Sequence, residues 1–396
     1  MPKSTHHDLH LAKRMSRLGT ETAFEVLNKA RALERKGKEI IHLEIGEPDF
    51  DTPGNVVEAG IDALRKGWTH YGPSAGLPEL RQAVADDVSR SRGVKVSAEE
   101  VVIVPGGKPI IFFAILALAD AGDEIIYPNP GFPIYESMIH YSGAKAMPIR
   151  LREERDFGFD VDELASLITD RTRLIILNSP HNPTGGVLSQ QDIHDIARAI
   201  GDRNIMVLSD EIYSRLIFEG EHYSILAAPR FQPRTILLDG FSKTYAMTGW
   251  RMGYGVMRRD LATHVTRLMT NSNSCTASFT QIAGIEALRG DQSSVERMRL
   301  EFQRRRDAFV AGLNRIVGFS CRLPKGAFYV FPNIKKTGWQ SKKLADALLT
   351  EAGVACLSGA SFGDFGEGYL RFSVANSLEN LNKALERIEQ WTKRNL

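Results

Sequence analysis

The sequence predicts an α/β protein with a large domain, in which helices cover both faces of a mostly parallel sheet, and a smaller α+β domain. Two observations support this fold class, and the length of the chain supports its division into two domains. The chain has 396 residues, which is more than one compact core usually holds. Its middle alternates short apolar runs with helix-length segments. Its last hundred residues or so consist mainly of charged amphipathic stretches around a few short strands.

Five apolar runs are the strand candidates of the large domain. Each is apolar throughout instead of alternating, which is typical of a strand covered on both faces. Helix-length segments at 109–119, 135–141 and 190–200 lie between the runs. The runs are VVIVPGG (101–107), EIIYPNPG (124–131), RLIILNSP (173–180), NIMVLSDE (204–211) and RTILLDGFSK (234–243).

The C-terminal part predicts the smaller domain. Two amphipathic helices, at 294–316 and 377–395, flank short strands in GAFYVFPNI (326–334) and GYLRFSVA (368–375). We expect 49–290 to form the large domain and 291–396 the small one, with a long helix joining them. Residues 1–48 are expected to pack with the small domain, because LEIGEPDFDTP ends in turn residues before the next helix.

Composition argues against several classes of protein. Hydrophobic residues make up 43% and charged residues 25% of the chain, as in ordinary globular domains. The net charge of +2 provides no general field for nucleic acid or an anionic membrane. The longest apolar run, 110–119, is about half of a membrane span. The first 14 residues lack the apolar stretch of a secretory signal.

The cysteines and histidines give no sign of a metal site. The three cysteines are far apart and contain no CxxC pair, which favours a reducing compartment and a cytoplasmic protein. A cluster of histidines near the N-terminus could bind a metal on a helix, but a loose tail is the simpler interpretation. These residues are Cys275, Cys321 and Cys356, and His6, His7 and His10.

Polar residues gather in the loops after the predicted strands. In parallel α/β sheets, ligands bind at the carboxyl ends of the strands. GGK (106–108) follows the first run, HNPTGG (181–186) the third, SDEIY (209–213) the fourth and DGFSKTYAMTGWRMGY (239–254) the fifth. We expect one crevice to collect Gly107, Asn182, Asp210, Tyr213, Lys243 and Arg251.

These residue types suit pyridoxal 5′-phosphate (PLP). Glycines at a helix start expose N–H groups and the positive helix end to a phosphate, which Arg251 can also bind. Asp210, at a buried strand end, needs a cationic partner. Lys243, crowded by other cations, would have a lowered pKa and could attack a carbonyl carbon. Phosphate, a protonatable ring nitrogen and an aldehyde together describe PLP, which forms a Schiff base with lysine.

The same motifs resemble those of class I, aspartate-aminotransferase-like enzymes of PLP fold type I, in family order from about residue 30 to the C-terminus. SKTYAMTGWRMGYG is similar to the family's lysine motif, and NSPHNPTGG to its Asn-Pro-Thr-Gly loop. The resemblance implies that Lys243 is the catalytic Schiff-base residue and that Arg251 binds the phosphate. It places Asp210 on the pyridine nitrogen, and Asn182 and Tyr213 on the phenolic oxygen.

The resemblance also implies substrate contacts and a homodimer. Arg371 in LRFSVA would hold the substrate α-carboxylate, together with Gly46 in IGEPDFDTP and with Asn182. Phe132 in YPNPGFPIY would stack on the cofactor ring. Tyr71 in HYGPSAGLPELR would reach the phosphate of the partner subunit.

Two positions depart from the family pattern. Pro109 follows GGK, where many members have a polar residue, and it has no N–H to offer the phosphate. A proline is nevertheless well suited to the first turn of a helix. Gly240 stands where many members have a phosphate-binding serine, so Ser242 becomes the candidate for that contact.

The expected reaction is a ping-pong transamination through the Lys243 Schiff base, with small-molecule amino and 2-oxo acids as substrates. Lys108 matches a lysine that binds the distal carboxylate of acidic substrates in one subgroup, so aspartate and 2-oxoglutarate are the expected pair; Lys108 could also lie in solvent. Aromatic, alanine and other aminotransferases remain alternatives, as does a PLP-dependent lyase. A DNA-binding regulator is disfavoured, because only about 40 residues precede LEIGEPDF.

Overall fold

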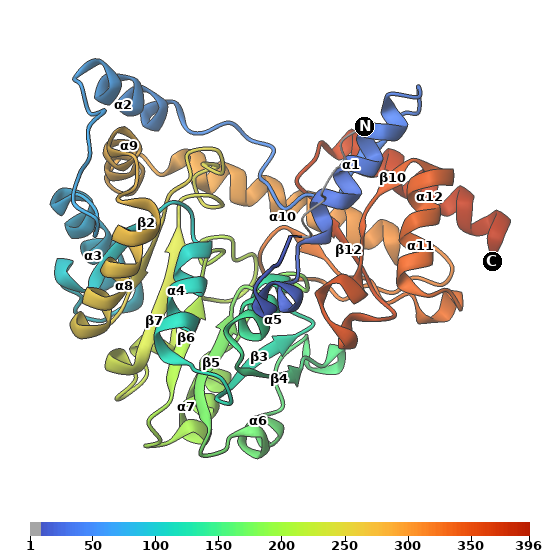
Figure 1. The fold of residues 1–396 in the computed structure, drawn as a ribbon. Helices are drawn as coiled ribbons and strands as arrows, with labels where there is room; N and C mark the ends of the chain where they lie inside the picture. The colour runs from blue at the N-terminus through green and yellow to red at the C-terminus, as the bar shows by residue number, and fades with distance from the viewer. Residues whose placement is uncertain (1–8) are drawn as a thin grey trace, which may run out of the picture.

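The computed structural model describes residues 9–396, and its large part is built on a seven-stranded sheet (Figure 1). All strands run in the same direction except β8, which is antiparallel to both β2 and β7. In spatial order the strands are β2 (Val101–Val104), β8 (Gly253–Val256), β7 (Thr235–Gly240), β6 (Met206–Asp210), β5 (Thr172–Asn178), β3 (Glu124–Asn129) and β4 (Lys145–Arg150).

Helices cover both faces of this sheet, which explains why its central strands are apolar throughout. Along β5, Leu174 and Ile176 pack in one cluster with α4, α5 and α8, whereas Ile175 and Leu177 pack in another with α6 and α7. At the β2 edge, α2, α3 and α9 complete the second face. The helices are α2 (Gly54–Arg65), α3 (Pro78–Arg92), α4 (Lys108–Leu118), α5 (Pro133–Ser142), α6 (Val161–Leu167), α7 (Gln190–Ile200), α8 (Arg259–Asn273) and α9 (Ser278–Arg289).

The five predicted apolar runs contain β2, β3, β5, β6 and β7, and the predicted helix at 190–200 is α7. Two strands of the sheet lacked a sequence signal. β4 is a half-exposed edge strand with a lysine and an arginine at its ends. β8 contains Gly253 and Gly255 and therefore shows no continuous apolar run. A Cβ at Gly253 would lie 2.8 Å from the backbone nitrogen of Gly107, so this glycine allows β8 to pass close to the loop before α4.

The smaller part combines the end of the chain with a segment near its beginning. Its three-stranded antiparallel sheet has the order β11-β12-β9, and β1 pairs in parallel with β10. The elements are α1 (Thr22–Glu34), β1 (Ile41–His42), α10 (Ser293–Leu313), β9 (Tyr329–Val330), α11 (Ser341–Ala347), β10 (Val354–Ala355), β11 (Leu357–Ser358), β12 (Leu370–Ser373) and α12 (Leu378–Asn395).

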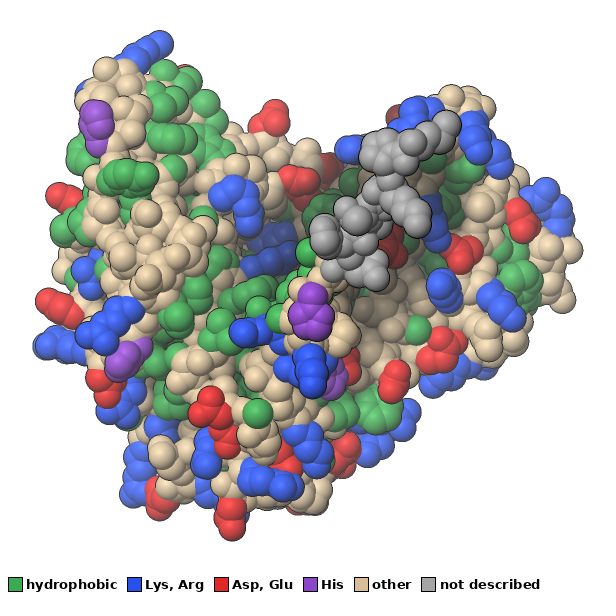
Figure 2. All heavy atoms as spheres, viewed as in Figure 1, with side chains coloured by type: hydrophobic (Ala, Val, Ile, Leu, Met, Phe, Trp, Pro, Cys, Tyr) green, Lys and Arg blue, Asp and Glu red, His purple; other side chains and the backbone are tan. Residues whose placement is uncertain are grey.

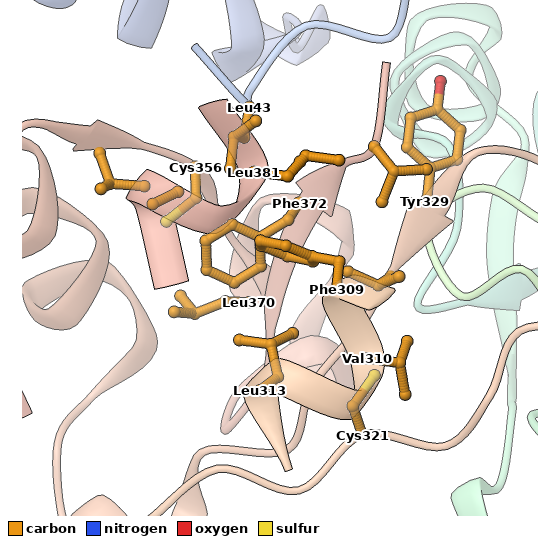
Figure 3. Close-up of a cluster of buried hydrophobic side chains, with 14 of the residues drawn as sticks. Leu43, Phe309, Val310, Leu313, Cys321, Tyr329, Cys356, Leu370, Phe372 and Leu381 are labelled. Atoms are coloured by element: carbon orange, nitrogen blue, oxygen red, sulfur yellow. The ribbon is translucent and has the colours of Figure 1, made fainter. Parts of the chain in front are cut away.

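The core of the smaller part joins α10, β12 and α12 (Figure 3). Phe309, Phe372 and Leu381 lie in it, and Leu43 joins them from the segment that follows β1. The long helix α10 also places Val295 in a core cluster of the large part, so one helix serves both parts. The division at residues 48 and 290 remains a prediction.

Two further observations concern membrane-spanning helices and metal sites. Within residues 9–396, no helix combines the length and apolarity needed to cross a membrane. The same residues contain no group of three or more His, Cys, Asp or Glu side chains that could hold a metal ion. His6 and His7 lie outside the described residues.

Candidate active site

A cavity of about 540 Å³ opens where the carboxyl ends of the large sheet face the smaller part. Figure 2 shows this side of the molecule hollowed, with lysine or arginine atoms deep in the hollow. Tyr71 does not line the cavity and is 89% exposed. All other predicted site residues line it: Gly46, Gly107, Lys108, Phe132, Asn182, Asp210, Tyr213, Ser242, Lys243, Arg251 and Arg371.

Lys243 follows β7 and extends into the cavity, where its Nζ donates a hydrogen bond to the backbone oxygen of Gly46. Burial lowers the pKa of Lys243 to about 8, and the positive charges of Arg371 and Lys108 act in the same direction. The carboxylate of Glu47 opposes them. An amine with this pKa loses its proton far more easily than an ordinary lysine and can then attack a carbonyl carbon.

Asp210, the last residue of β6, is a buried carboxylate without a basic partner within ion-pair distance among the described residues. Its Oδ2 accepts a hydrogen bond of 2.6 Å from the Tyr135 hydroxyl, and its Oδ1 accepts one of 3.3 Å from the Ile212 amide. Burial raises the pKa of Asp210 to about 6, although both hydrogen bonds favour the ionised form. A ligand that carries a protonated nitrogen would give this carboxylate the partner it lacks.

Asn182 is held against the end of β6 by a second asparagine that the sequence analysis did not single out. Asn178 Oδ1 accepts a hydrogen bond of 3.0 Å from the backbone N–H of Asn182. Asn178 Nδ2 donates one of 3.0 Å to the backbone oxygen of Asp210. The Tyr213 hydroxyl lies 2.7 Å from that of Tyr329, on β9. The loop after β5, the loop after β6 and the smaller sheet therefore meet at one place.

Arg371, on β12, is a buried cation in the cavity wall. Its Nη1 donates to Asn182 Oδ1 at 3.3 Å, its Nη2 donates to the backbone oxygen of Glu44, and its Nε has no partner. Its guanidinium carbon lies 4.5 Å from the centre of the Tyr329 ring. None of the recorded ion pairs of the described residues includes Arg371, so it is suited to bind an anionic group of a ligand.

Gly46 lines the cavity and has no room for a side chain. A Cβ at this position would overlap the hydroxyl of Tyr329. The backbone oxygen of Gly46 also accepts the bond from Lys243. The glycine thus lets the backbone of the N-terminal segment approach both side chains closely.

The start of α4 gives the cavity a place that is suited to an anion. Gly107 is the N-cap of α4, and Pro109 occupies the second helical position, where its missing N–H removes one possible donor. Gly106 has a φ of +83°, and a Cβ there would overlap the guanidinium group of Arg251, so the arginine lies against the start of the helix. Positive charge at a helix N-terminus is a common phosphate site.

The structure accounts for Gly240, which departs from the serine common in the family. Gly240 pairs with Gly253 where β7 meets β8. A Cβ at Gly240 would lie 2.9 Å from the Gly253 Cα, so a serine there requires the strands to move apart. Ser242, two residues on, is buried and lines the cavity.

Among the cavity residues that the sequence did not identify are Glu21, Tyr135, Asn178 and Tyr329. Glu21 precedes the region that carries the family motifs, and its Oε1 lies 2.6 Å from Lys108 Nζ. Tyr135 and Tyr329 fall in segments predicted only as a helix and a strand. Asn178 ends β5 within the third apolar run, and its position at a strand end pointed to it.

Comparison with known proteins decides the family. A family described as aminotransferase class I and II matches residues 38–388. The chain belongs to this family. It is 42% identical to an aspartate aminotransferase of Pyrococcus horikoshii, over 96% of each chain. It is 39% identical to aromatic-amino-acid aminotransferase 2 of Thermococcus litoralis, over 89% of this chain and 92% of the relative.

A solved structure shows the same fold. The aspartate aminotransferase from Thermus thermophilus with maleate matches with a TM-score of 0.93 at 36% identity, over 96% of this chain and 99% of that one. The predicted fold type I class and the predicted activity of a PLP-dependent aminotransferase are therefore confirmed.

PLP, the cofactor of this aminotransferase family, fits the cavity. Asp210 has no cationic partner in the described part of the chain, and the protonated ring nitrogen would supply one. Arg251 lies against the N-terminal end of α4, where a phosphate can bind. Lys243 has the lowered pKa that a carbonyl-binding amine requires. The roles of the individual residues remain predictions.

Proposed function

We propose that this aminotransferase moves the amino group of aspartate to 2-oxoglutarate by a ping-pong reaction. The observation that carries the proposal is a pair of cations in one cavity: Arg371, which is buried and has no acidic partner among residues 9–396, and Lys108 at the start of α4. Aspartate and 2-oxoglutarate each carry two carboxylates, so each can use both cations. The relative from Pyrococcus horikoshii, named an aspartate aminotransferase, supports this choice.

Lys243 has two roles in the proposed reaction. Its amine would hold the cofactor, and as a free amine it would move a proton to and from the substrate α-carbon. Its hydrogen bond to the backbone oxygen of Gly46 supports this position, because the same segment contacts Arg371 through the backbone oxygen of Glu44. PLP supplies the chemistry that Lys243 lacks, because its ring accepts the electrons released at the α-carbon.

Other residues set the charge and orientation of the reacting groups. Asp210 keeps the ring nitrogen protonated, and Asn182 and Tyr213 hydrogen-bond the phenolic oxygen. Arg371 would hold the substrate α-carboxylate and so fix the orientation of the α-carbon in the cavity. Phe132, which precedes α5 at the cavity wall, stacks on the ring.

The phosphate contacts extend to a second copy of the chain. Gly107, Ser242 and Arg251 bind the phosphate from one subunit, and Tyr71 binds it from the partner. Support comes from exposure: Tyr71 stands outside its own cavity, and hydrophobic side chains gather over α2 (Figure 2). Leu64 at the end of α2 is 48% exposed. A homodimer would cover this surface.

A cytoplasmic location completes the proposal. Cys275, Cys321 and Cys356 are all free thiols in the structure, as a reducing compartment permits.

Replacing Lys108 with alanine tests the acidic substrate. We expect kcat/KM for aspartate with 2-oxoglutarate to fall about 30-fold, because a charge-assisted contact is lost. With alanine as donor and pyruvate as acceptor, kcat/KM should change less than about threefold. Coupled assays of both pairs, run on wild type and variant, provide the measurement.

The exposed Lys95 is the matched control, because Lys95→Ala removes the same charge outside the cavity. Equal losses for both substrate pairs in Lys108→Ala would reject the acidic-substrate assignment. A wild-type protein with bound PLP that transfers no amino group from aspartate would reject it as well.

Hybrid dimers test Tyr71. Tyr71→Ala alone should weaken PLP binding about tenfold or more, because a hydrogen bond to a charged phosphate is lost. Lys243→Ala alone should be inactive. When the two variants are mixed and Tyr71 reaches across the interface, each hybrid dimer has one site that contains both Tyr71 and Lys243. The PLP concentration that gives half-maximal activity should then equal that of the wild type. If hybrids need as much PLP as the Tyr71→Ala homodimer, Tyr71 acts within its own chain.

A further inference from the structure

Glu21 places a carboxylate inside the cavity at the position where the distal group of a substrate is expected. Its Oε1 lies 2.6 Å from Lys108 Nζ, and Glu21 itself lines the cavity. Its side chain is only 15% exposed, whereas that of Lys108 is 44% exposed. The lysine assigned to an acidic substrate is therefore already neutralised by the protein.

We propose that Glu21 competes with the distal carboxylate of an acidic substrate for Lys108. With the Glu21–Lys108 ion pair closed, the cavity accepts amino and 2-oxo acids with uncharged side chains. With the pair open, Lys108 binds the second carboxylate of an acidic one. The inference rests on the proposed function, which assigns that carboxylate to Lys108.

The Glu21 side chain is free to leave Lys108 without breaking the fold. It is the N-cap residue of α1, yet its side chain accepts no capping hydrogen bond. Lys108 is its one recorded ion-pair partner among residues 9–396. The backbone is held on both sides, by α1 itself and by Gly19, whose amide donates to the Ser137 hydroxyl on α5 at 3.0 Å. Side-chain rotation is therefore sufficient to open the pair.

The walls around this ion pair suit uncharged side chains. Phe24 on α1, Ile111 on α4 and Phe132 before α5 line the same cavity. Lys108 Nζ lies 5.6 Å from the centre of the Phe132 ring. With the pair closed, the two charges cancel and apolar surface remains for a substrate to contact. With the pair open, one positive charge faces the cavity.

A ping-pong reaction explains why an ion pair between Glu21 and Lys108 that can open and close would be useful. Donor and acceptor occupy the same cavity in turn, so a cavity that pairs an uncharged amino acid with an acidic 2-oxo acid must bind both. A fixed, unpaired Lys108 would disfavour binding of the uncharged substrate. The ammonium group of Lys108 would lose its contact with water without gaining an anionic partner. Glu21 supplies that partner whenever the substrate does not.

Replacing Glu21 with glutamine separates the two binding modes. The variant keeps the size of the side chain and removes its charge. We expect kcat/KM for aspartate to rise about fivefold to tenfold and kcat/KM for phenylalanine to fall, or stay within about twofold. Binding of maleate, a dicarboxylate that cannot donate an amino group, should tighten by the same factor when measured by calorimetry on the holoenzyme.

Two further variants control the experiment. Glu25→Gln makes the same change four residues later, on an exposed side chain of α1 outside the cavity, and should leave kcat/KM for both substrates unchanged. In a Lys108→Ala background, Glu21→Gln should no longer raise kcat/KM for aspartate, because the effect acts through Lys108. Stoichiometric PLP binding, measured by equilibrium dialysis, shows that each variant folds and takes up the cofactor.

The outcomes distinguish this inference from the proposed function. If Lys108→Ala lowers kcat/KM for aspartate selectively but Glu21→Gln leaves the ratio of aspartate to phenylalanine unchanged, or lowers it, competition by Glu21 is rejected and the proposed function stands. If Lys108→Ala affects both substrates equally, the proposed function fails and this inference falls with it. A raised ratio that persists without Lys108 also overturns the inference.

Discussion

Replacing Lys243 with alanine is expected to lower the rate of amino transfer at least about 10⁴-fold, because one side chain holds the cofactor and moves the proton. A single-turnover reaction of the PLP-loaded variant with aspartate measures this rate. The variant should still fold, since Lys243 projects into a cavity instead of filling a core. Its affinity for a substrate carboxylate should persist, because Arg371 is unchanged.

Lys243→Arg is the control that separates charge from proton transfer. Arginine keeps a positive charge in the cavity but does not lose its proton in a protein. The variant should therefore be about as inactive as Lys243→Ala. A Lys243→Arg enzyme within about tenfold of wild type would show that positive charge alone is required, and the assignment of Lys243 as the proton carrier would be wrong.

Replacing Asp210 with asparagine is expected to lower kcat about 10²- to 10⁴-fold and to weaken PLP binding. The amide keeps the shape of the carboxylate but cannot balance a protonated ring nitrogen. The cofactor without that proton accepts electrons poorly. Steady-state rates and equilibrium dialysis of PLP measure the two effects.

Tyr135→Phe is the matched control, because it removes the 2.6 Å hydrogen bond to Asp210 and leaves the carboxylate in place. Its loss in kcat should stay below about tenfold. A pH series adds a second check on Asp210 itself. Burial raises the pKa of Asp210 to about 6 without cofactor, so below that pH the carboxyl is protonated and neutral. PLP affinity should fall as the pH drops through 6, and Asp210→Asn should lack this dependence.

The positions of the main strands and of most candidate site residues could be predicted because one rule connects them. Strands buried on both faces are apolar throughout, and ligands bind where parallel strands end. Asp210 ends β6 and Lys243 follows β7, so each stands next to a recognisable run. β8 could not be predicted in this way, because close backbone contacts require its glycines and the strand therefore has no continuous apolar run.

Residues that act through distant contacts could not be predicted from local patterns. Glu21 is about 87 positions from Lys108 in the chain, and their 2.6 Å approach depends on how the N-terminal segment lies over the large sheet. Tyr329 meets Tyr213 across two sheets that the sequence does not orient relative to each other. The proposed role of Tyr71 requires a second chain and remains a prediction.

The central claim is that Lys243 moves the proton at the substrate α-carbon. The most direct test incubates the PLP-loaded enzyme with aspartate in deuterium oxide, without a 2-oxo acid, and follows the α-hydrogen by nuclear magnetic resonance. We predict that wild type replaces the α-hydrogen with deuterium and that Lys243→Ala, which still binds aspartate, does not. Exchange by Lys243→Ala at the wild-type rate would contradict the claim, because another base would then remove the proton.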